Sequence, residues 1–351
     1  MWERFEGLLM SEVALEKPES WLWHLLGFVL PSVALAGNVL GEWWVLSGFV
    51  LAFGIYPILD WLLGEDHHRR EVRTNGTPFE VLLVLHAFLV LPLVATVIWR
   101  GMEDGNAWTT WAAALSTGVA VGMSGIVVGH EMGHKKHKSA RWYLGRMTLY
   151  LSLYPHFTTE HNHNHHRLVG MAEDGASAPK GRGLWTQFAI TIPQQFMSAW
   201  RTQAERSKSV LHNSILHGLL IQFALIAAIF HFAGMWGLGA FLFQAALAIF
   251  LLEYVNYIRH YGLERSEGER QTEMHSWQSK KRLSRWVLIE LTLHPAHHMK
   301  ASTPFWQLQP YEGAPELPTG YFGMFWPSLI PPLWKRWMDP RIPEESSDSV
   351  N

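Results

Sequence analysis

The sequence predicts an all-α integral membrane protein, a bundle of about six transmembrane helices with a histidine-rich cap on its cytoplasmic side. The chain of 351 residues is 48% hydrophobic and only 17% charged, a balance too apolar for the surface of an ordinary soluble protein. Its mean hydropathy is nevertheless +0.02, so the apolar residues must be gathered into blocks. Most of the 20 histidines stand outside these blocks, which places them in the cap.

Six stretches are long enough to cross the hydrocarbon core of a bilayer, which takes roughly 20 mostly apolar residues. They lie near residues 21–39, 43–63, 79–99, 107–129, 211–232 and 236–258. Very short turns join the first two stretches and the last two, so each of these pairs is predicted to form a tight helical hairpin. The expected organisation is an N-terminal cytoplasmic segment at 1–20, one membrane domain at 21–340 and a polar tail at 341–351.

The distribution of basic residues predicts the orientation, because loops rich in lysine and arginine remain on the cytoplasmic side of a membrane. Arg69, Arg70 and Arg73 follow the second stretch, and four basic residues follow the fourth stretch between 135 and 141. Both termini and the histidine-rich regions are therefore expected on the cytoplasmic face.

Composition excludes several classes of site and partner. The chain has no cysteine, so disulfides, iron–sulfur clusters, thiolate zinc sites and a fused rubredoxin-type electron carrier are excluded. Its net charge of −2 gives no reason to expect nucleic acid as a partner. Any metal ion must be held by nitrogen or oxygen ligands.

Histidines recur at spacings that suit metal binding. His130 and His134 end the fourth stretch four residues apart, which puts both imidazoles on one face of a helix. His161 and His165 have the same spacing and are expected to share a face, with His166 on an adjacent one. The nine candidate ligands are His130, His134, His161, His165, His166, His260, His294, His297 and His298.

Nine imidazoles are too many for one metal ion, because a zinc site takes four ligands and a catalytic one takes three. Two metal ions with four or five imidazoles each fit the count. Imidazole suits zinc, copper, iron and nickel alike. Iron is favoured because a redox centre beside apolar membrane helices suits a hydrocarbon substrate and dioxygen.

Two other classes of protein also carry histidines in a membrane. The His130–His134 spacing, with Glu131 as a base, is that of zinc metalloproteases, but the surplus of histidines argues against a protease. A metal transporter should place ligands along the middle of its spans, whereas these cluster at span ends. Six other histidines are not expected to bind metal. His24, His86 and His231 should pack between helices or lie at the membrane interface, and His137, His156 and His163 should lie behind the ligands or at the surface.

The four clusters resemble the motifs of the integral-membrane alkane hydroxylases, a branch of the membrane fatty-acid desaturase and hydroxylase superfamily. The matching segments are His130–Lys135 with HExxHK, Glu160–His166 with EHxxGHH, Asn256–Leu263 with NYxEHYGL, and His294–His298 with HSxHH. Glu173–Ser177 and Leu317–Tyr321 extend the similarity, which covers most of the chain.

The resemblance implies a six-helix bundle whose nine histidines hold two iron ions beneath a substrate channel. It implies hydroxylation of the terminal carbon of medium- to long-chain alkanes to primary alcohols, with O₂ as co-substrate. It further implies a bacterial inner membrane location and an external electron donor, a rubredoxin with its reductase. Asp174, Glu131 and Glu160 are expected near the metals as acceptors for imidazole N–H groups.

Three departures from the family pattern stand near these motifs. Asn164 replaces a glycine, Arg259 replaces a glutamate, and Pro295-Ala296 replaces a Ser-Asp pair. None removes a ligand, but losing carboxylates near the metals should alter reactivity or substrate. Arg259 either clamps a substrate carboxylate or is an ordinary arginine flanking a span. A clamp would make the substrate a fatty acid, to be decarboxylated to a terminal alkene, desaturated or hydroxylated.

Overall fold

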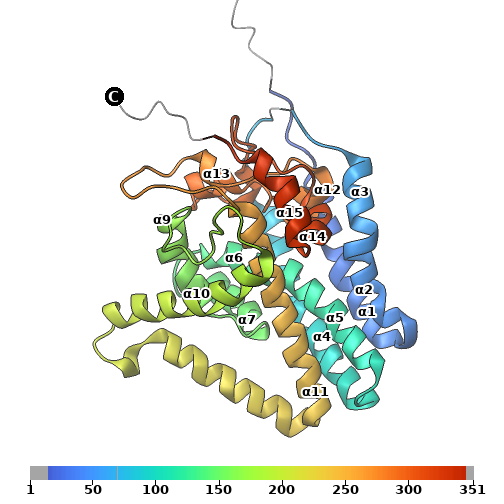
Figure 1. Ribbon diagram of the computed structural model, residues 1–351. Helices are drawn as coiled ribbons and strands as arrows, with labels where there is room; N and C mark the ends of the chain where they lie inside the picture. The colour runs from blue at the N-terminus through green and yellow to red at the C-terminus, as the bar shows by residue number, and fades with distance from the viewer. Residues whose placement is uncertain (1–14, 69, 345–351) are drawn as a thin grey trace, which may run out of the picture.

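The protein is described by a computed structural model that covers residues 15–68 and 70–344 (Figure 1). Within these ranges the secondary structure is helical and contains no β-strand, only isolated bridges, which confirms the all-α class. Most of the predicted N-terminal segment, Arg69 and most of the polar tail lie outside the described residues. The three-part division of the chain therefore stays a prediction.

Among the described residues, five helical stretches are long and apolar enough to cross a membrane. The first two are Trp21–Leu40, made of η1 (Trp21–Phe28) and α1 (Val29–Leu40), and Glu42–Leu63, made of η2 (Glu42–Leu46), α2 (Ser47–Val50), η3 (Leu51–Ile55) and α3 (Tyr56–Leu63). The others are α4 (Thr77–Asp104), Trp108–Gly133 with α5 (Trp108–Ala120), η4 (Val121–Ile126) and α6 (Val127–Gly133), and α11 (Ser214–His260).

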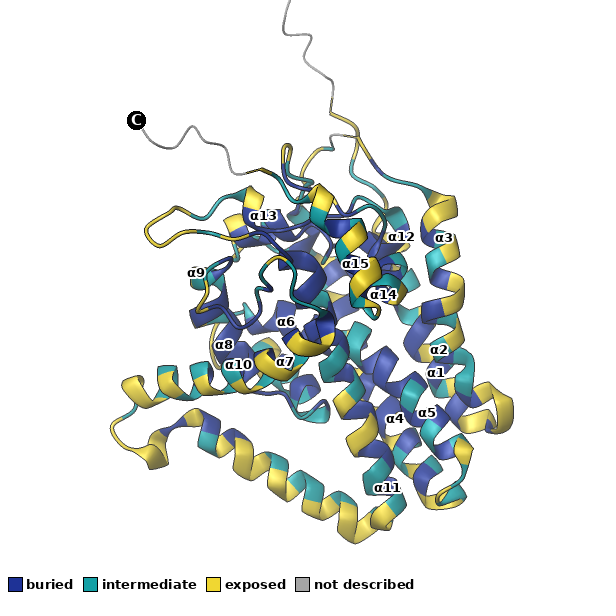
Figure 2. Cartoon of the chain, in the orientation of Figure 1, coloured by how far each residue is buried: buried dark blue, intermediate teal, exposed yellow. Residues whose placement is uncertain are grey.

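The count differs from the six predicted spans because the last two form one continuous element. Helix α11 has 47 residues, but Gly234 inside it has the non-helical angles φ 65° and ψ −169°. The helix therefore turns sharply there, and residues 214–233 and 235–260 run in different directions (Figure 1). The first arm exposes many large apolar side chains, whereas the second packs against α4 and α5 (Figure 2).

The remaining helices mostly surround the histidine-rich end, and all of them except the 23-residue α10 are short. Before α11 they are α7 (Ala140–Leu151), α8 (Phe157–Glu160), η5 (His161–His165), α9 (His166–Leu168), α10 (Leu184–Arg206) and η6 (Val210–His212). After α11 they are η7 (Glu273–His275), α12 (Arg282–Val287), α13 (His294–Met299), η8 (Phe305–Gln307), α14 (Tyr321–Ser328), α15 (Pro331–Met338) and η9 (Asp339–Arg341).

The end of the bundle away from α9 and α13 has the character of a membrane interface (Figure 1). Gly41 and Gly105 make tight turns there with φ of 74° and 61°. The guanidinium of Arg100 donates to the carbonyl of Asn38 at 2.9 Å and pairs with Asp104 at 3.0 Å, which satisfies the end of α1. Ring contacts join the tryptophans of this end in the pairs Trp43–Trp108 and Trp111–Trp236.

Three segments are π-helical, namely η3, η4 and η5. A π-helix bonds residue i to i+5 and is often found at functional sites. Each segment lies inside a longer helical run, so it shifts the direction in which the following side chains point. The segments η3 and η4 contain glycine, whereas η5 contains neither glycine nor proline, so the shift at η5 could not have been predicted from these residues.

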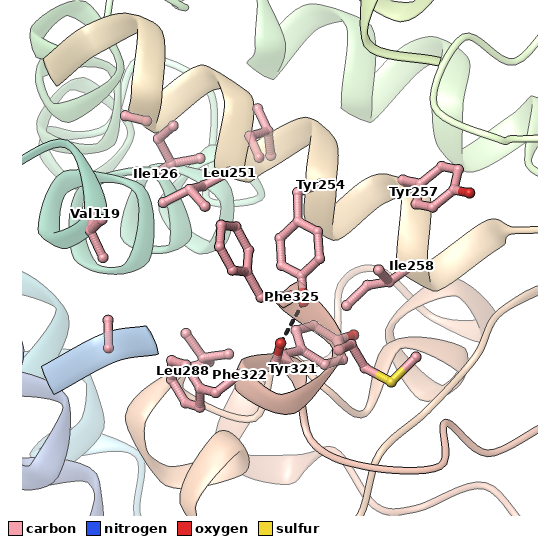
Figure 3. Close-up of a cluster of buried hydrophobic side chains, with 14 of the residues drawn as sticks. Val119, Ile126, Leu251, Tyr254, Tyr257, Ile258, Leu288, Tyr321, Phe322 and Phe325 are labelled. Carbon is pink, nitrogen blue, oxygen red and sulfur yellow. Dashed lines mark hydrogen bonds between the residues drawn. The ribbon is translucent and has the colours of Figure 1, made fainter. Parts of the chain in front are cut away.

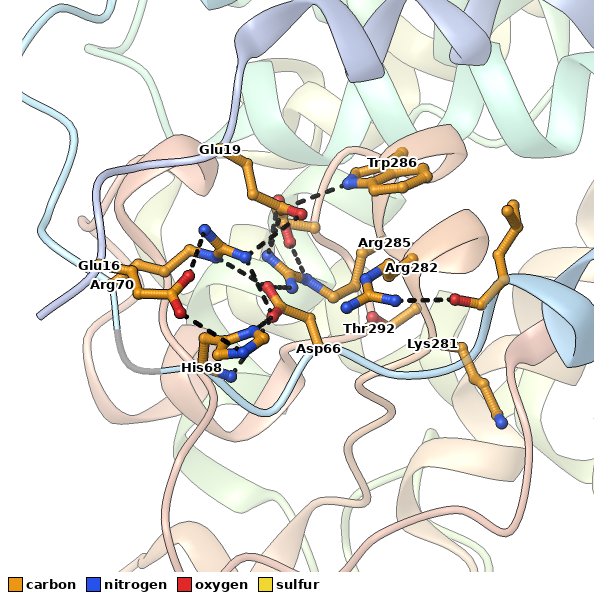
Figure 4. Close-up of polar contacts among 12 residues, drawn as sticks. Glu16, Glu19, Asp66, His68, Arg70, Lys281, Arg282, Arg285, Trp286 and Thr292 are labelled. Carbon is orange, nitrogen blue, oxygen red and sulfur yellow. Dashed lines mark hydrogen bonds and ion pairs between the residues drawn. The ribbon is translucent and has the colours of Figure 1, made fainter.

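A buried network of charges ties the loops at the histidine end together (Figure 4). Arg285 pairs with Glu290 at 2.7 Å, with Asp66 at 3.1 Å and with Glu19 at 3.5 Å. Glu290 follows Ile289 in a turn where both residues have positive φ, 59° and 46°, a conformation that is costly for a β-branched side chain. The ion pairs of Glu290 hold this turn, which leads directly into α13.

The close packing of α5 against α11 predicts that a methyl group added at Gly118 destabilises the protein. A Cβ at Gly118 would lie 2.7 Å from the carbonyl oxygen of Gln244 and 2.8 Å from Leu247 Cβ, so α5 and α11 would have to separate. We expect Gly118→Ala to lower the free energy of unfolding by about 1–3 kcal/mol. Thermal unfolding in detergent, followed by tryptophan fluorescence, measures this loss. Gly54→Ala is the control, because its Cβ would meet only Val50 Cγ1 at 3.9 Å.

The charge network predicts a pH-dependent contribution to stability. Burial alone would raise the pKa of Glu290, but Arg285 and His24 hold that pKa well below its ordinary value. A depressed carboxylate pKa contributes stability above the unfolded pKa, and this stability is lost as the pH falls toward the folded pKa. We expect Glu290→Gln to cost about 3–5 kcal/mol at neutral pH.

Thermal unfolding of wild type and Glu290→Gln between pH 7 and pH 3 tests this account. The two melting temperatures should converge as the pH falls. A constant gap between them would contradict the ion-pair explanation. The exposed Glu267→Gln serves as the control and should unfold like the wild type at every pH.

Candidate metal centre

Eight of the nine candidate histidines gather into two groups of four. Within each group the ligand nitrogens lie within 4.8 Å of one another. The first group is His130, His134, His161 and His297, and the second is His165, His260, His294 and His298. The members come from the end of α6 and the residue after it, from η5, from the end of α11 and from α13, so the centre exists only in the folded protein.

The ninth histidine, His166, lies between the two groups. Its Nε2 is 3.0 Å from His161 Nε2. Its ring centroid is 4.8 Å from that of His297 in the first group and 4.7 Å from that of His298 in the second. All nine candidate positions are therefore brought together, and the distance to His161 favours five imidazoles in the first group.

The π-helix η5 decides how the central cluster is divided. On a regular helix His161 and His165 would share a face, as the sequence analysis expects. In the structure their rings stack at 5.3 Å, but His161 belongs to the first group and His165 to the second. The wider π turn brings His161 beside His166, five residues on, instead.

Hydrogen bonds from Nδ1 leave the Nε2 lone pairs of two imidazole rings free to face the middle of the second group. His165 Nδ1 donates to Asp174 at 3.0 Å, and His260 Nδ1 donates to the carbonyl of His275 at 3.1 Å. A neutral imidazole has one N–H, so in both rings Nε2 must carry a lone pair. Nε2 of His165 faces its group without a hydrogen-bond partner among the described residues, and the same holds for His134.

The close approach of imidazole nitrogens in the second group is explained by a bound cation. His294 Nε2 lies 3.1 Å from His260 Nε2 and 2.8 Å from His298 Nε2. One imidazole cannot complement two neighbours through a single ring nitrogen, whereas a metal ion accepts several lone pairs at once. The residues present therefore fit imidazole-bound transition-metal ions, one for each group.

The protonation of the rings agrees with this chemistry. Burial, together with the charges of neighbouring groups, lowers the pKa of His134 to about 4 and that of His166 to about 2. Both imidazoles are therefore neutral at physiological pH, which is the form that binds metals.

Asp174 stands behind the second group. Its carboxylate accepts hydrogen bonds from His165 Nδ1, from Ser177 Oγ at 2.6 Å and from the backbone N–H of Ala176 at 3.1 Å. Burial alone would raise the pKa of Asp174, but His165 holds it below its ordinary value. An ionised carboxylate in this position orients the imidazole and increases its basicity.

The other two acidic candidates have different surroundings. Glu131 Oε1 lies 3.8 Å from Lys135 Nζ, which also pairs with Glu80 at 2.8 Å. Glu160 is buried, and burial together with the carboxylates of Asp174 and Glu253 raises its pKa. Neither carboxylate has a hydrogen bond to an imidazole among the described residues.

Glu253 is a buried residue that the sequence analysis did not single out. It accepts hydrogen bonds from Gln195 at 2.8 Å, Thr191 at 3.0 Å and Tyr154 at 3.1 Å. Glu253 thus links α10 to the second arm of α11, seven residues before His260 in the same helix. The available signal was its position, since it is the sole acidic residue in the predicted span 236–258.

The histidines expected to lie outside the centre belong to neither group. Two of them pack between helices, where His24 pairs with Glu290 at 3.1 Å and His86 contacts Ser124 Oγ at 2.6 Å. The others stand at the surface or beside aromatic rings, namely His137, His156, His163 and His231.

An apolar cavity adjoins the first group. Its lining combines the π-helical segments η3 and η4 with the second arm of α11, for example Phe53, Met123 and Leu251. Figure 3 shows Ile126, Leu251 and Tyr254 of this wall facing Phe322 and Tyr321 of α14. His130 and Arg259 line the same cavity, so the histidines and the apolar space are continuous.

Arg259 is buried in this wall, with 3% of its surface exposed. The structure therefore contradicts the expectation of an ordinary arginine that flanks a span at the membrane surface. The two other departures are accommodated by local structure. Asn164 accepts a hydrogen bond from Thr202 at 3.0 Å, and Pro295 lies in the first turn of α13, where proline fits a helix.

The fold and the site together define a class of protein, an integral membrane protein with histidine groups that could hold metal ions beside an apolar cavity. Comparison with known proteins narrows this class. The family model for fatty acid desaturases matches residues 106–328.

Three relatives are similar over most of the chain. Alkane 1-monooxygenase 1 of Pseudomonas aeruginosa is 33% identical over 97% of this chain and 94% of its own length. The alkane 1-monooxygenase of Pseudomonas putida is 32% identical, with coverages of 92% and 85%. Alkane 1-monooxygenase 1 of Alcanivorax borkumensis is 31% identical, with coverages of 94% and 86%. The chain therefore belongs to the fatty acid desaturase family and, within it, to the alkane 1-monooxygenases.

The contact between Asp174 and His165 predicts a specific loss of metal affinity. Asp174→Asn keeps an acceptor for the His165 N–H but removes the negative charge. We expect metal affinity to fall by about 10- to 100-fold. Metal retained after dialysis against graded concentrations of a chelator measures the change. Glu173→Gln, at the exposed neighbouring position, should retain metal like the wild type.

Proposed function

We propose that this protein hydroxylates the terminal carbon of medium- to long-chain alkanes to primary alcohols, with O₂ as co-substrate. The observation that carries the proposal is the continuity of the first histidine group, through His130, with an apolar cavity. A cavity lined almost entirely by apolar side chains suits a hydrocarbon. Membership of the alkane 1-monooxygenases supports the same substrate class.

In this proposal the nine histidines hold two iron ions, with His166 beside the first group. Iron supplies the activation of O₂, which no amino-acid side chain can provide. The protein positions the ligands, since Asp174 holds the N–H of His165 and the carbonyl of His275 holds that of His260. The apolar walls position the chain and exclude water from the reacting carbon.

The proposed setting follows the same reasoning. We propose that the histidine end and both termini face the cytoplasmic side of a bacterial inner membrane, because basic residues are concentrated in the loops at that end. The two electrons that the reaction requires come from a separate protein, for which we propose a rubredoxin and its reductase. The absence of cysteine from the chain agrees with an external donor.

Two other classes of function find less support. A metalloprotease would need Glu131 as a base, but this carboxylate lies beside Lys135 and the site holds nine histidines. A metal transporter would need ligands along a path through the bilayer, whereas the two groups form one compact cluster at one end of the helices.

Metal content and product identity test the proposal. Protein purified in detergent should contain about two iron ions per chain, because nine imidazoles suit two sites. With rubredoxin, its reductase, ¹⁸O₂ and dodecane, it should form 1-dodecanol that carries ¹⁸O. One zinc ion per chain and no O₂-dependent product would overturn the assignment.

Single variants test the division into two groups. We expect His130→Ala and His165→Ala each to lower the iron content toward about one per chain and to abolish product formation, because each removes a ligand from a different group. His231→Ala changes an exposed histidine on the first arm of α11 and should leave both quantities unchanged. Loss of all iron in either variant would indicate one shared site instead of two.

A further inference from the structure

Arg259 is the cationic side chain in the wall of the apolar cavity. Its Nε donates to the hydroxyl of Tyr321 at 3.1 Å, and its guanidinium carbon lies 5.6 Å from the centre of that ring. Its Nη2 is buried and has no hydrogen-bond partner among the described residues. Both contacts with Tyr321 are to an uncharged group, so the guanidinium keeps an unsatisfied donor and an uncompensated positive charge.

Other buried arginines of the protein are satisfied differently. Arg285 forms ion pairs with Glu19, Asp66 and Glu290, the first two of which are labelled in Figure 4. Arg73 lies 3.9 Å from Glu290. For Arg259 no carboxylate lies within 4.0 Å in the described part of the chain. A buried charge without a partner costs several kcal/mol, and the fold retains this one. The other buried arginines have carboxylates of the protein as counter-charges, whereas the positive charge of Arg259 could be balanced by a bound ligand.

The surroundings of Arg259 restrict what that ligand can be. The cavity wall next to it is apolar, and includes Phe157, Leu252 and Phe322. His130 of the first histidine group lines the same cavity. A ligand that satisfies both parts has a negatively charged head that accepts hydrogen bonds and an alkyl chain that fills the apolar remainder. A planar carboxylate matches the two Nη groups of a guanidinium whose Nε is already engaged.

We infer that the cavity binds alkyl chains with a carboxylate at the end that reacts, held by Arg259, in preference to an unsubstituted alkane of equal length. This inference rests on the proposed function for its chemistry. The head group would lie at the histidine end, so oxidation would take place on the carbon next to it. The balanced reaction is R–CH₂–COO⁻ + O₂ + 2 e⁻ + 2 H⁺ → R–CHOH–COO⁻ + H₂O, with electrons from the external donor.

Equilibrium binding tests the inference without any turnover. Iron-loaded protein in lipid nanodiscs, kept without O₂ and electron donor, is titrated with tritium-labelled dodecanoate, and binding to empty nanodiscs is subtracted. Unlabelled dodecane and 1-dodecanol, matched in chain length, serve as competitors. We expect dodecanoate to bind about 10- to 100-fold more tightly than dodecanol, the range for a hydrogen bond to a charged group. Equal displacement by all three compounds would overturn the inference.

Variants assign the preference to the guanidinium. Arg259→Gln should remove the advantage of dodecanoate over dodecanol, while Arg259→Lys should retain part of it through charge alone. Arg270→Gln, at an exposed position, is the matched control and should bind like the wild type. An unchanged preference in a folded Arg259→Gln would overturn the inference. The competition in the wild type provides a test even if that variant does not fold.

Product analysis separates this inference from the proposed function. Iron-loaded protein receives the donor system with dodecane or dodecanoate. If dodecane yields 1-dodecanol while dodecanoate binding does not depend on Arg259, the proposed function holds and the inference fails. If dodecanoate binding depends on Arg259 but neither compound is oxidised, the carboxylate site stands and the proposed function fails. Formation of 2-hydroxydodecanoate supports both.

Discussion

The convergence of buried imidazole lone pairs is the constraint on which the rest of the structure depends. Nine imidazole rings point nitrogen atoms at two small volumes, and neighbouring nitrogens approach within 2.8 to 3.2 Å. Such an arrangement is unfavourable unless cations occupy the two volumes, since lone pairs repel and their hydration has been lost. The surrounding protein must therefore hold four separate segments in place. The network around Arg285 and Glu290 does so for α13, and the hydrogen bonds of Glu253 do so for the end of α11.

Membrane helices explain why the cavity can be both apolar and close to a polar centre. The helices bury their small residues against one another, as at Gly118, and expose large apolar side chains to lipid. At the histidine end the regular helices give way to π segments. The segments η3 and η4 line the cavity, and η5 divides its histidines between the two groups. One structural device thus shapes the space for a substrate and the site that would act on it.

Arg259 sets this chain apart within that common plan. An arginine in an apolar wall is costly, yet its neighbours include no carboxylate in the described residues, and its Nη2 is left without a partner. The histidine centre and the cavity are accounted for by the alkane 1-monooxygenase family. The arginine is not, because the motif it interrupts carries a glutamate at this position. The chemistry of the head group is thus a separate question from the chemistry of the metal centre.

The sequence by itself determined the helical membrane class and pointed to the nine histidines that the structure brings together, because hydrophobic length and local spacing are properties of short segments. It also pointed to Asp174 and Arg259. It did not separate His161 from His165, since a π turn looks like an α turn in sequence. It did not reveal that the last two predicted spans form the single helix α11. It also did not reveal that Glu253 is buried in a hydrogen-bond network near the histidines. Whether Arg259 faces water or a cavity, and which carbonyl holds His260, depend on contacts between distant segments, so only the tertiary structure could decide them.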